Sequence, residues 1–372
     1  MKKIVIITPS LAGGGAEKIA VNLANEYASR GHNVELVLFK AKGPYLKLVN
    51  NNVALNDLDI RKPKLAFLEL RKYLRKNRDA LFLSVIRTAN IHVGLASIGL
   101  GLNCLIFREA NTLEAVLEKP LFRRFLSKSA MALSYYFANG IIANSPDTKN
   151  DLIKNKITWR DKVAVIPNPV LPSGYQSLYA KEVEHPWFNN EDFKVVLAVG
   201  RLHKQKNFSF LISAFKYVLT QEPKARLLII GEGDEEHQLI NQITSSGMKE
   251  YVKLEKFKAN VFPYYYNAHL FALSSDWEGF GNVLVEALAA GLPIVSTNCN
   301  GGPKFILADR IYGTLVSIGD ARGFANAILE ELQNTNKKLH SIEYSKNFTV
   351  DIISQQYLLE LTKHARRTRK SK

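Results

Sequence analysis

Residues 3–15 read KIVIITPSLAGGG, and residues 193–200 read FKVVLAVG. Each stretch is a short apolar run that ends in glycine, and helical patterns follow over 16–30 and 208–219. Strand, loop and helix then alternate along the rest of each half. This order predicts two doubly wound α/β domains with parallel sheets, which bind their ligands at the carboxyl ends of the strands.

The length of the chain, 372 residues, fits two domains of ordinary size. A polar, proline-containing and aromatic stretch, 169–192, separates the two α/β patterns. We therefore expect an N-terminal domain over 1–180 and a C-terminal domain over 181–349. The remaining residues, 350–372, form a helical pattern and a basic tail that could pack back on the first domain.

The composition, 47% hydrophobic and 23% charged, is typical of a globular protein and not of a disordered or fibrous one. The two cysteines, Cys104 and Cys299, provide neither a disulfide framework nor a zinc-binding spacing, which favours a reducing compartment. The apolar run that begins at Ile4 is too short for a signal peptide. The uncharged stretch 88–107 contains polar residues and glycines, so it predicts a buried helix followed by a strand and not a membrane span.

The formal net charge of +16 is unevenly distributed. Residues 1–185 hold 27 basic and 15 acidic residues, whereas residues 186–372 hold 23 and 19, with five of those basic residues in the C-terminal tail. Within 61–78, eight basic residues accompany the single Glu69, with leucines at helical spacing between them, and 119–128 is a second basic and apolar segment. Such segments suit an anionic membrane surface, although an ordinary solvated helix face has the same pattern.

The glycine-rich turn at Gly13, Gly14 and Gly15 is similar to a dinucleotide-binding loop, but its spacing differs. The third glycine of that pattern would fall on Lys18, and Lys40 stands where the ribose-binding acid is expected. This argues against a nicotinamide-dependent dehydrogenase. The glycines would still let backbone N–H groups approach an anion at the start of a helix, unless they form a plain tight turn.

Two cations mark the first strand-to-helix connection of the second domain. Arg201 follows the strand and Lys206 precedes the helix, so both should project from the carboxyl end of the sheet. An arginine can fork onto phosphate oxygens and a lysine adds a point charge, so together they could neutralise a diphosphate without a metal. Two solvated loop cations would give the same pattern.

A second pattern begins at Glu278 and leads through glycines into a helix. Backbone N–H groups around Gly281, Asn282 and Val283 would form an anion site at the start of that helix. Glu286 stands about two helical turns after Glu278, and carboxylates suit the hydroxyls of a diol. We therefore expect Glu286 to bind a ribose and Glu278 a sugar. An acidic residue near the start of a helix also complements the helix dipole. This alternative would explain Glu278 by itself, but not the other residues of the pattern.

With these residues in place, the sequence resembles the retaining glycosyltransferases of glycosyltransferase family 4, which have the GT-B fold. The resemblance extends over nearly the whole chain, and its most specific element is the pair Glu278 and Glu286. The other matching segments are 13–17, 166–170, Gly200-Arg201-Leu202 with Lys206-Asn207, and Gly231-Glu232-Gly233. The resemblance implies two Rossmann-like domains that face an interdomain cleft.

The resemblance also implies site residues. It gives Glu278, Arg201 and Lys206 the catalytic roles, with the two cations on the leaving diphosphate and Glu278 on the transferred sugar. The donor site would comprise Gly14, Gly15, Arg201, Lys206, Gly281, Asn282, Val283 and Glu286. We expect donor binding without a metal or other cofactor.

One departure from the family concerns the acceptor side of the first domain. Many members carry a histidine at a position that here falls on Ala110, so the role of that histidine is not carried over. Glu109 or Asn111 could line the site instead, and Glu17 lies in the glycine loop on the same side.

The expected reaction is transfer of a sugar, with retention, from a nucleotide diphosphate sugar, above all a UDP-sugar. The acceptor would be a hydroxyl of a glycan or of a polyprenyl-diphosphate-linked sugar, as in bacterial lipopolysaccharide or capsule assembly. The basic first domain predicts a cytoplasmic protein bound peripherally to the inner face of the membrane. Asp57 and Asp59 could bind a metal, but a hard cation needs more converging oxygens than this pair supplies.

Two other functions remain open at this point. A sugar-nucleotide epimerase can share the fold, and it would process a nucleotide sugar without any acceptor. A non-enzymatic binder of membranes or nucleic acid would use the basic charge, but it would have no use for Glu278 and Glu286. The sequence contains no RNP, KH or zinc-finger signature, so we expect no nucleic-acid partner.

Overall fold

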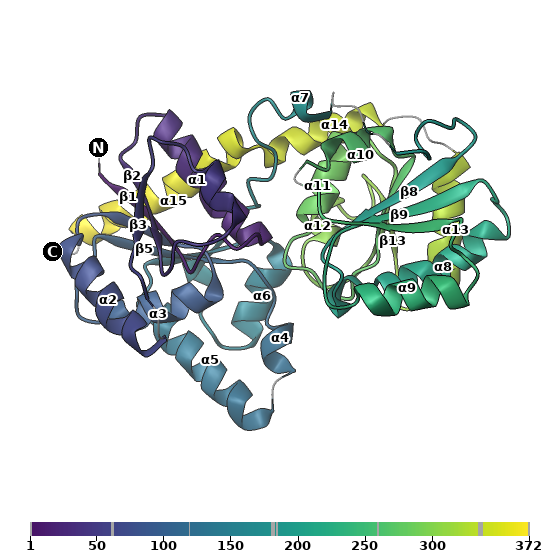
Figure 1. Ribbon diagram of the computed structural model, residues 1–372. Helices are drawn as coiled ribbons and strands as arrows, with labels where there is room; N and C mark the ends of the chain where they lie inside the picture. The colour runs from purple at the N-terminus through teal and green to yellow at the C-terminus, as the bar shows by residue number, and fades with distance from the viewer. Residues whose placement is uncertain are drawn as a thin grey trace. The chain divides into compact units, whose positions relative to one another are not determined.

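The computed structural model describes residues 2–60, 63–118, 120–179, 183, 185–258, 260–333 and 338–370. The chain forms two compact units: Met1–Pro172 with Phe348–Lys372, and Ser173–Asn347 (Figure 1). The boundary lies earlier than the expected position near residue 180. The reason is that Tyr179 donates a hydrogen bond to the carbonyl of Glu286 at 3.0 Å, and Asn260 donates to the carbonyl of Leu178 at 3.2 Å. These contacts fix the segment to the second unit.

The first unit contains a parallel sheet with the strand order β3-β2-β1-β4-β5-β6-β7. Its strands are β1 (Ile4–Thr8), β2 (Val34–Leu38), β3 (Ala54–Asp57), β4 (Leu81–Ser84), β5 (Cys104–Glu109), β6 (Gly140–Ala143) and β7 (Val163–Val165). In β1, Ile4 and Ile6 pack into one core, and Val5 and Ile7 pack into another on the opposite face. Burial on both faces explains why these strands are continuous apolar runs.

The helices of the first unit cover both faces of this sheet. They are α1 (Gly15–Ser29), α2 (Pro63–Lys76), α3 (Arg87–Ser97), α4 (Glu114–Leu117), α5 (Leu121–Tyr136), α6 (Pro146–Lys154) and α15 (Val350–Lys370). In one core, Tyr27 of α1 packs with Tyr357 and Leu361 of α15, which lies beside α1 (Figure 1). In the other, Leu70 of α2 packs with Tyr135 of α5. The terminal helix thus belongs to the first unit.

Parts of the expected basic segments lie outside the described residues. They are Arg61, Lys62, Lys119, and the side chains of the tail from residue 366 onward. The uncharged stretch 88–107 forms α3 and then β5, as a helix followed by a strand. In the described part of the chain, no helix is long and apolar enough to cross a membrane.

The second unit has a parallel sheet with the order β10-β9-β8-β11-β12-β13. Its strands are β8 (Lys194–Val199), β9 (Ala225–Ile230), β10 (Val252–Glu255), β11 (Leu270–Leu273), β12 (Ile294–Thr297) and β13 (Thr314–Val316). Its helices are α7 (Gln176–Tyr179), α8 (Phe208–Leu219), α9 (Glu236–Ser245), α10 (Phe262–Asn267), α11 (Asn282–Ala289), α12 (Pro303–Ile306), α13 (Ala321–Gln333) and α14 (Leu339–Ser345). The central strands β8 and β11 are neighbours, so the loops that follow them meet at one edge of the sheet.

Candidate functional site

The loops after β8 and β11 bring two of the expected site residues together. The Lys206 Nζ atom donates to Glu278 Oε1 at 2.5 Å, and Ser275 Oγ donates to the same oxygen at 2.6 Å. The side chains of Lys206 and Glu278 are only 16% and 6% exposed. The structure therefore places a shielded ion pair at the carboxyl edge of the sheet, where ligands of such folds bind.

The two loops are also joined by hydrogen bonds from side chains of one loop to backbone carbonyls of the other. Ser274 donates its hydroxyl to the carbonyl of Lys206 at 2.7 Å, and the Gln205 side chain donates to the carbonyl of Trp277 at 2.9 Å. Asn207 adopts a left-handed conformation, with φ 45°, and its side chain accepts a hydrogen bond from the first turn of α8. These bonds fix the position of the Lys206 backbone relative to the loop after β11.

The expected segment Gly231-Glu232-Gly233 packs directly against the loop that carries Arg201. A Cβ atom at Gly231 would lie 1.8 Å from the carbonyl oxygen of Gly200, and a Cβ atom at Gly233 would lie 2.2 Å from that of Leu202. Only glycine allows backbones to approach this closely. Segments 200–202 and 231–233 therefore pack against each other as one close backbone contact.

A similar contact supports Glu278. A Cβ atom at Gly301 would lie 2.1 Å from the carbonyl oxygen of Glu278, and one at Gly302 would lie 1.8 Å from that of Phe280. The Glu278 N–H group also donates to the carbonyl of Asn300 at 3.0 Å. The loop after β12 thus fixes the backbone around Glu278, a contribution that no motif in the sequence indicates.

Arg201 differs from Lys206 in its surroundings. Its side chain is exposed, and within the described residues it makes no hydrogen bond or ion pair. An exposed guanidinium can bind an anionic ligand from solution.

Helix α11 begins at the same edge. Its N-terminal cap is Gly281, with φ 95°, and Asn282 and Val283 form its first turn. Glu286 lies in the second turn and is mostly buried, and Tyr265 of α10 donates a hydrogen bond to its Oε2 atom at 3.0 Å. Burial and then the charge of Glu286 raise the pKa of Tyr265, so the phenol remains a donor.

In the first unit, the glycine loop leads into α1 as expected. Gly14 is the N-terminal cap and Gly15 the first helical residue. A Cβ atom at Gly14 would lie 2.3 Å from Glu17 Oε2, so the carboxylate of Glu17 lies against the start of the helix. Its charge complements the helix dipole there. A phosphate approaching Gly14 and Gly15 would meet this carboxylate.

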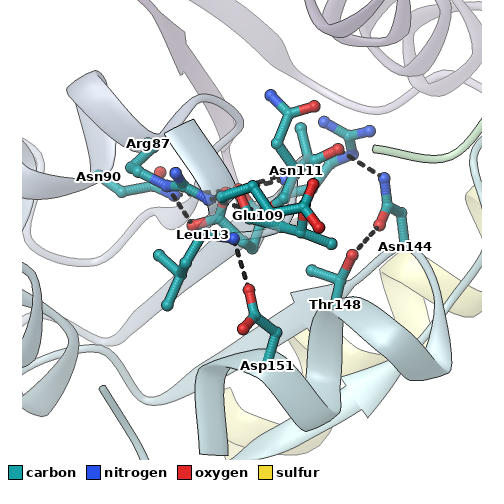
Figure 2. A network of polar contacts seen from close by, with 12 residues as sticks. Arg87, Asn90, Glu109, Asn111, Leu113, Asn144, Thr148 and Asp151 are labelled. Carbon is teal, nitrogen blue, oxygen red and sulfur yellow. Dashed lines mark hydrogen bonds and ion pairs between the residues drawn. The ribbon is translucent and has the colours of Figure 1, made fainter. Parts of the chain in front are cut away.

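The two acceptor-side candidates at the end of β5, Glu109 and Asn111, lie in different environments (Figure 2). Glu109 is fully buried, and it accepts hydrogen bonds from Arg87 at 3.0 Å and from Tyr135 at 2.5 Å. Direct contact between Glu109 and an acceptor is therefore not supported. Asn111, in contrast, is exposed. No pattern in the sequence indicates that Arg87 and Tyr135 would bond to Glu109. Likewise, none indicates that Tyr265 would bond to Glu286, or Ser275 to Glu278.

The possible metal pair in the first unit has a simpler structural role. The Asp57 side chain accepts a hydrogen bond from the N–H group of Asp59 at 2.9 Å, which closes a turn after β3. In the part of the chain that the structure describes, no three side chains of histidine, cysteine, aspartate or glutamate gather where they could hold a metal ion.

Comparison with known families agrees with this geometry. The model described as Glycosyltransferase Family 4 matches residues 13–173, and the model described as Glycosyl transferases group 1 matches residues 181–348. The chain belongs to glycosyltransferase family 4. The two matches together span most of this glycosyltransferase, and the second contains Arg201, Lys206, Glu278 and Glu286.

The glycosyltransferase is similar over nearly its full length to two enzymes of Campylobacter jejuni. One is named N-acetylgalactosamine-N,N'-diacetylbacillosaminyl-diphospho-undecaprenol 4-alpha-N-acetylgalactosaminyltransferase; it is 28% identical over 346 residues, which cover 90% of this chain and 91% of that protein. The other is an alpha-1,4-N-acetyl-D-galactosaminyltransferase named for a related undecaprenol-linked glycan; it is 27% identical, with 96% and 98% covered.

Solved structures show the same fold. The Anabaena protein HepE, crystallised with UDP-glucose, superposes with a TM-score of 0.79 and 21% identity, covering 98% of this chain and 100% of that one. The glycosyltransferase thus has the GT-B fold, with two Rossmann-like domains, as the sequence predicts.

Proposed function

We propose that this glycosyltransferase transfers a sugar from a UDP-sugar to a hydroxyl of a polyprenyl-diphosphate-linked glycan, with retention at the anomeric carbon. The observation that carries the proposal is the meeting of Lys206, Glu278 and the start of α11 at the carboxyl edge of the second sheet. The names of the two Campylobacter relatives, which act on undecaprenol-linked substrates, support the acceptor class. The UDP-glucose bound to HepE supports the donor class.

The demanding step is departure of the diphosphate from the sugar. The exposed Arg201 can fork onto phosphate oxygens, Lys206 supplies a second positive charge, and the first turn of α11 offers backbone N–H groups. These groups stabilise the negative charge that develops on the leaving group, which is where electrostatic catalysis acts most strongly. Donor binding then needs no metal. Glu286, held by Tyr265, binds the ribose hydroxyls.

Retention is proposed through front-face transfer. The bond from the anomeric carbon to the diphosphate oxygen breaks while the bond to the acceptor oxygen forms, and a leaving phosphate oxygen takes the acceptor proton. Glu278 contacts the transferred sugar and holds Lys206, and it forms no covalent bond. Both Campylobacter relatives are named for α-linked products, and transfer from an α-linked nucleotide sugar to an α-linked product is retention.

The test is to incubate the protein with a panel of UDP-sugars and an undecaprenyl-diphosphate-linked glycan in EDTA. We expect one UDP-sugar to give a lengthened glycan and UDP, and an α-anomeric coupling constant in the product by NMR. A β-linked product would refute retention. Conversion of a UDP-sugar without any acceptor would favour the epimerase, and no conversion in any reaction would favour a non-enzymatic binder.

The lipid-linked acceptor requires contact with an anionic membrane, and α5 is the surface that we propose for it. Met131 and Tyr135 of α5 pack into the core, yet another face of the helix exposes large apolar side chains in its first half and again near its C-terminal end. These side chains are Leu121, Phe122, Phe125, Leu126, Leu133 and Tyr136. The helix contains three basic residues and no acidic one. An apolar face flanked by positive charge is the pattern of a helix that lies in the membrane interface.

The basic helix α2 is a weaker candidate. Leu70 and Leu74 are buried in the core, and Arg71 donates hydrogen bonds to the carbonyls of Ala96 and Ile98 at 3.1 and 2.8 Å, at the end of α3. Arg71 therefore stabilises the fold itself. Lysines and arginines elsewhere on α2 would add only electrostatic attraction, which salt screens.

Flotation on vesicles of neutral and anionic phospholipid tests this surface. We expect wild-type protein to float with anionic vesicles and to keep part of its binding in high salt, since apolar insertion is not screened. Phe122→Gln with Phe125→Gln should abolish the salt-resistant part, and Leu339→Gln, an exposed leucine of α14, is the matched control. Unchanged flotation of the double variant would refute insertion of α5. If neutralising Lys72 of α2 abolished vesicle binding while the α5 double variant still bound, α2 would be favoured as the membrane-binding surface.

A further inference from the structure

The loop that follows β5, residues 110–113 and hereafter the β5 loop, is held almost entirely by side chains (Figure 2). It lies at the carboxyl edge of the first sheet, after a central strand, which is the usual place for a ligand in such a sheet. The carbonyl of Leu113 accepts hydrogen bonds from the N–H groups of Val116 and Leu117 in α4, but the backbone groups of residues 110–112 pair with no other strand or helix among the described residues. Instead they are bonded to side chains from β5, α3, α6 and the connection between β6 and α6.

The first support is a buried ion pair at the end of β5. Arg87, the first residue of α3, donates from Nε to Glu109 Oε2 at 3.2 Å and from Nη2 to Glu109 Oε1 at 3.0 Å. Tyr135 donates to the same carboxylate at 2.5 Å. The two charged side chains are 17% and 1% exposed. Burial acts against the charge of Arg87, but the Glu109 carboxylate outweighs it, so that the pKa of Arg87 is raised.

This ion pair reaches the backbone of the loop. Arg87 Nη2 also donates to the carbonyl of Asn111 at 2.6 Å and to that of Thr112 at 3.0 Å. Glu109 Oε1 accepts a hydrogen bond from the N–H group of Ala110 at 3.2 Å. One arginine thus ties the end of β5 to two carbonyl groups beyond it.

The second support comes from the opposite side of the loop. Asn144 donates to the carbonyl of Ala110 at 2.8 Å, and its own side-chain oxygen accepts a hydrogen bond from Thr148 at 2.9 Å. Asp151 of α6 accepts a hydrogen bond from the N–H group of Leu113. Asn144 and Thr148 are fully buried, so both are fixed in position before any ligand arrives.

Ordering a loop costs backbone entropy at every residue, and the hydrogen bonds from these side chains offset that cost. Thr112 and Leu113 are buried, whereas Asn111 is exposed on this fixed backbone. A side-chain amide both donates and accepts hydrogen bonds, as a sugar hydroxyl does. Groups that are positioned by surrounding residues bind without losing further freedom.

We propose that Arg87 and Asn144 are positioning residues that hold the β5 loop so that the Asn111 side chain binds hydroxyl groups of the sugar acceptor. The proposal rests on the proposed function, because it assigns the acceptor side of the same reaction. It makes Glu109 an indirect contributor through Arg87. The substrate that it concerns is the acceptor and not the nucleotide sugar.

The experiment compares acceptor and donor kinetics in variants of the full-length protein. Asn111→Ala should raise the KM for the glycan acceptor about five- to tenfold, as expected for a lost hydrogen bond, with unchanged UDP affinity by calorimetry. Arg87→Met should have at least the same effect on acceptor KM, and Arg87→Lys, which keeps the charge but not the fork, should recover part of it. Asn52→Ala is the control, an exposed asparagine that precedes the amino end of β3.

Several results would overturn the proposal. One is a wild-type acceptor KM in Asn111→Ala, and another is a fall in UDP affinity equal to the rise in acceptor KM. Should Arg87→Met fail to fold, Asn144→Ala removes a single bond to the loop, and wild-type acceptor kinetics in that variant would refute the positioning role. A wild-type protein that transfers no sugar to any acceptor would overturn the proposed function together with this inference, whereas an active wild type with insensitive variants would overturn this inference alone.

Discussion

The close packing of the loops around Arg201 leads to a quantitative prediction for Gly231→Ala. The added Cβ atom would lie 1.8 Å from the carbonyl oxygen of Gly200, and real Cβ atoms essentially never approach within 3.0 Å. The distance between these two atoms must therefore grow from 1.8 Å to at least 3.0 Å, through movement of the backbone at Gly200, at Gly231 or at both. The Gly200 N–H group also donates to the carbonyl of Ile230 at 3.0 Å, so the shift disturbs the pairing of β8 with β9. Any shift at Gly200 also displaces Arg201, the next residue in the chain.

The size of the effect follows from this displacement. A misplacement of about 1 Å in a group that positions substrate can cost roughly 10²-fold in rate. We therefore expect kcat/KM of Gly231→Ala to fall by about 10²-fold and UDP affinity to fall measurably. Because the overlap involves backbone, no rotation of a side chain can relieve it.

The assay combines calorimetric titration with UDP and steady-state sugar transfer, after thermal unfolding has shown that each variant is folded. Gly247→Ala is the control: its φ of +69° makes alanine strained, but the position faces open space. That control should lose about 1–2 kcal/mol of stability and keep wild-type UDP affinity. A folded Gly231→Ala protein with wild-type UDP affinity and turnover would refute the placement of Arg201 at the donor site.

Three other predictions concern side chains. Glu278→Gln should lower kcat by about 10²-fold in steady-state assays. Calorimetry should show UDP binding retained or tighter, because Lys206 is released from the ion pair to the diphosphate. Equal losses of kcat and of UDP affinity would contradict this role of Glu278. Tyr265→Phe should weaken UDP binding about fivefold, since the carboxylate of Glu286 loses a donor of roughly 1 kcal/mol. Tyr357→Phe should lower the free energy of unfolding in urea by about 1–3 kcal/mol, because the buried Arg108 loses a hydrogen-bond partner at 3.2 Å; an unchanged midpoint would contradict that role.

The fold could be predicted from the sequence because parallel strands that are buried on both faces must be apolar throughout. The runs before Gly13 and Gly200 have this property, and both form central strands. The same reasoning distinguished a helix and strand from a membrane span over 88–107. The expected boundary near residue 180 lies a few residues after the division of the chain at Pro172, because a polar linker pattern does not show which unit a segment packs against.

The donor-side residues could be proposed from local spacing, but their mutual contacts could not. Lys206 and Glu278 are far apart in the sequence, and they meet because β8 and β11 are neighbours in the sheet. Glu109 illustrates the limit more clearly. The sequence suggests that Glu109 could line the acceptor site, whereas Arg87 and Tyr135, from two different helices, bury and bond it.

Helical spacing also left the role of the basic segments undecided. Apolar residues recur along both α2 and α5, but periodicity alone does not show whether they face a core or solvent. In α2, Leu70 is buried; in α5, Phe122 and Phe125 are 73% and 68% exposed. The distinction depends on which helices pack against each other, which is a property of the folded chain.

The central claim is that the second unit binds a nucleoside diphosphate through Arg201 without a metal. Calorimetric titration with UDP and with GDP in EDTA, on the wild type and on Arg201→Ala, tests it most directly. We predict that UDP binds the wild type and that Arg201→Ala weakens this binding at least tenfold, as expected for the loss of charge-assisted hydrogen bonds. Binding of GDP alone would contradict the UDP assignment. Absence of binding by either nucleotide, or equal UDP affinity in the variant, would contradict the central claim.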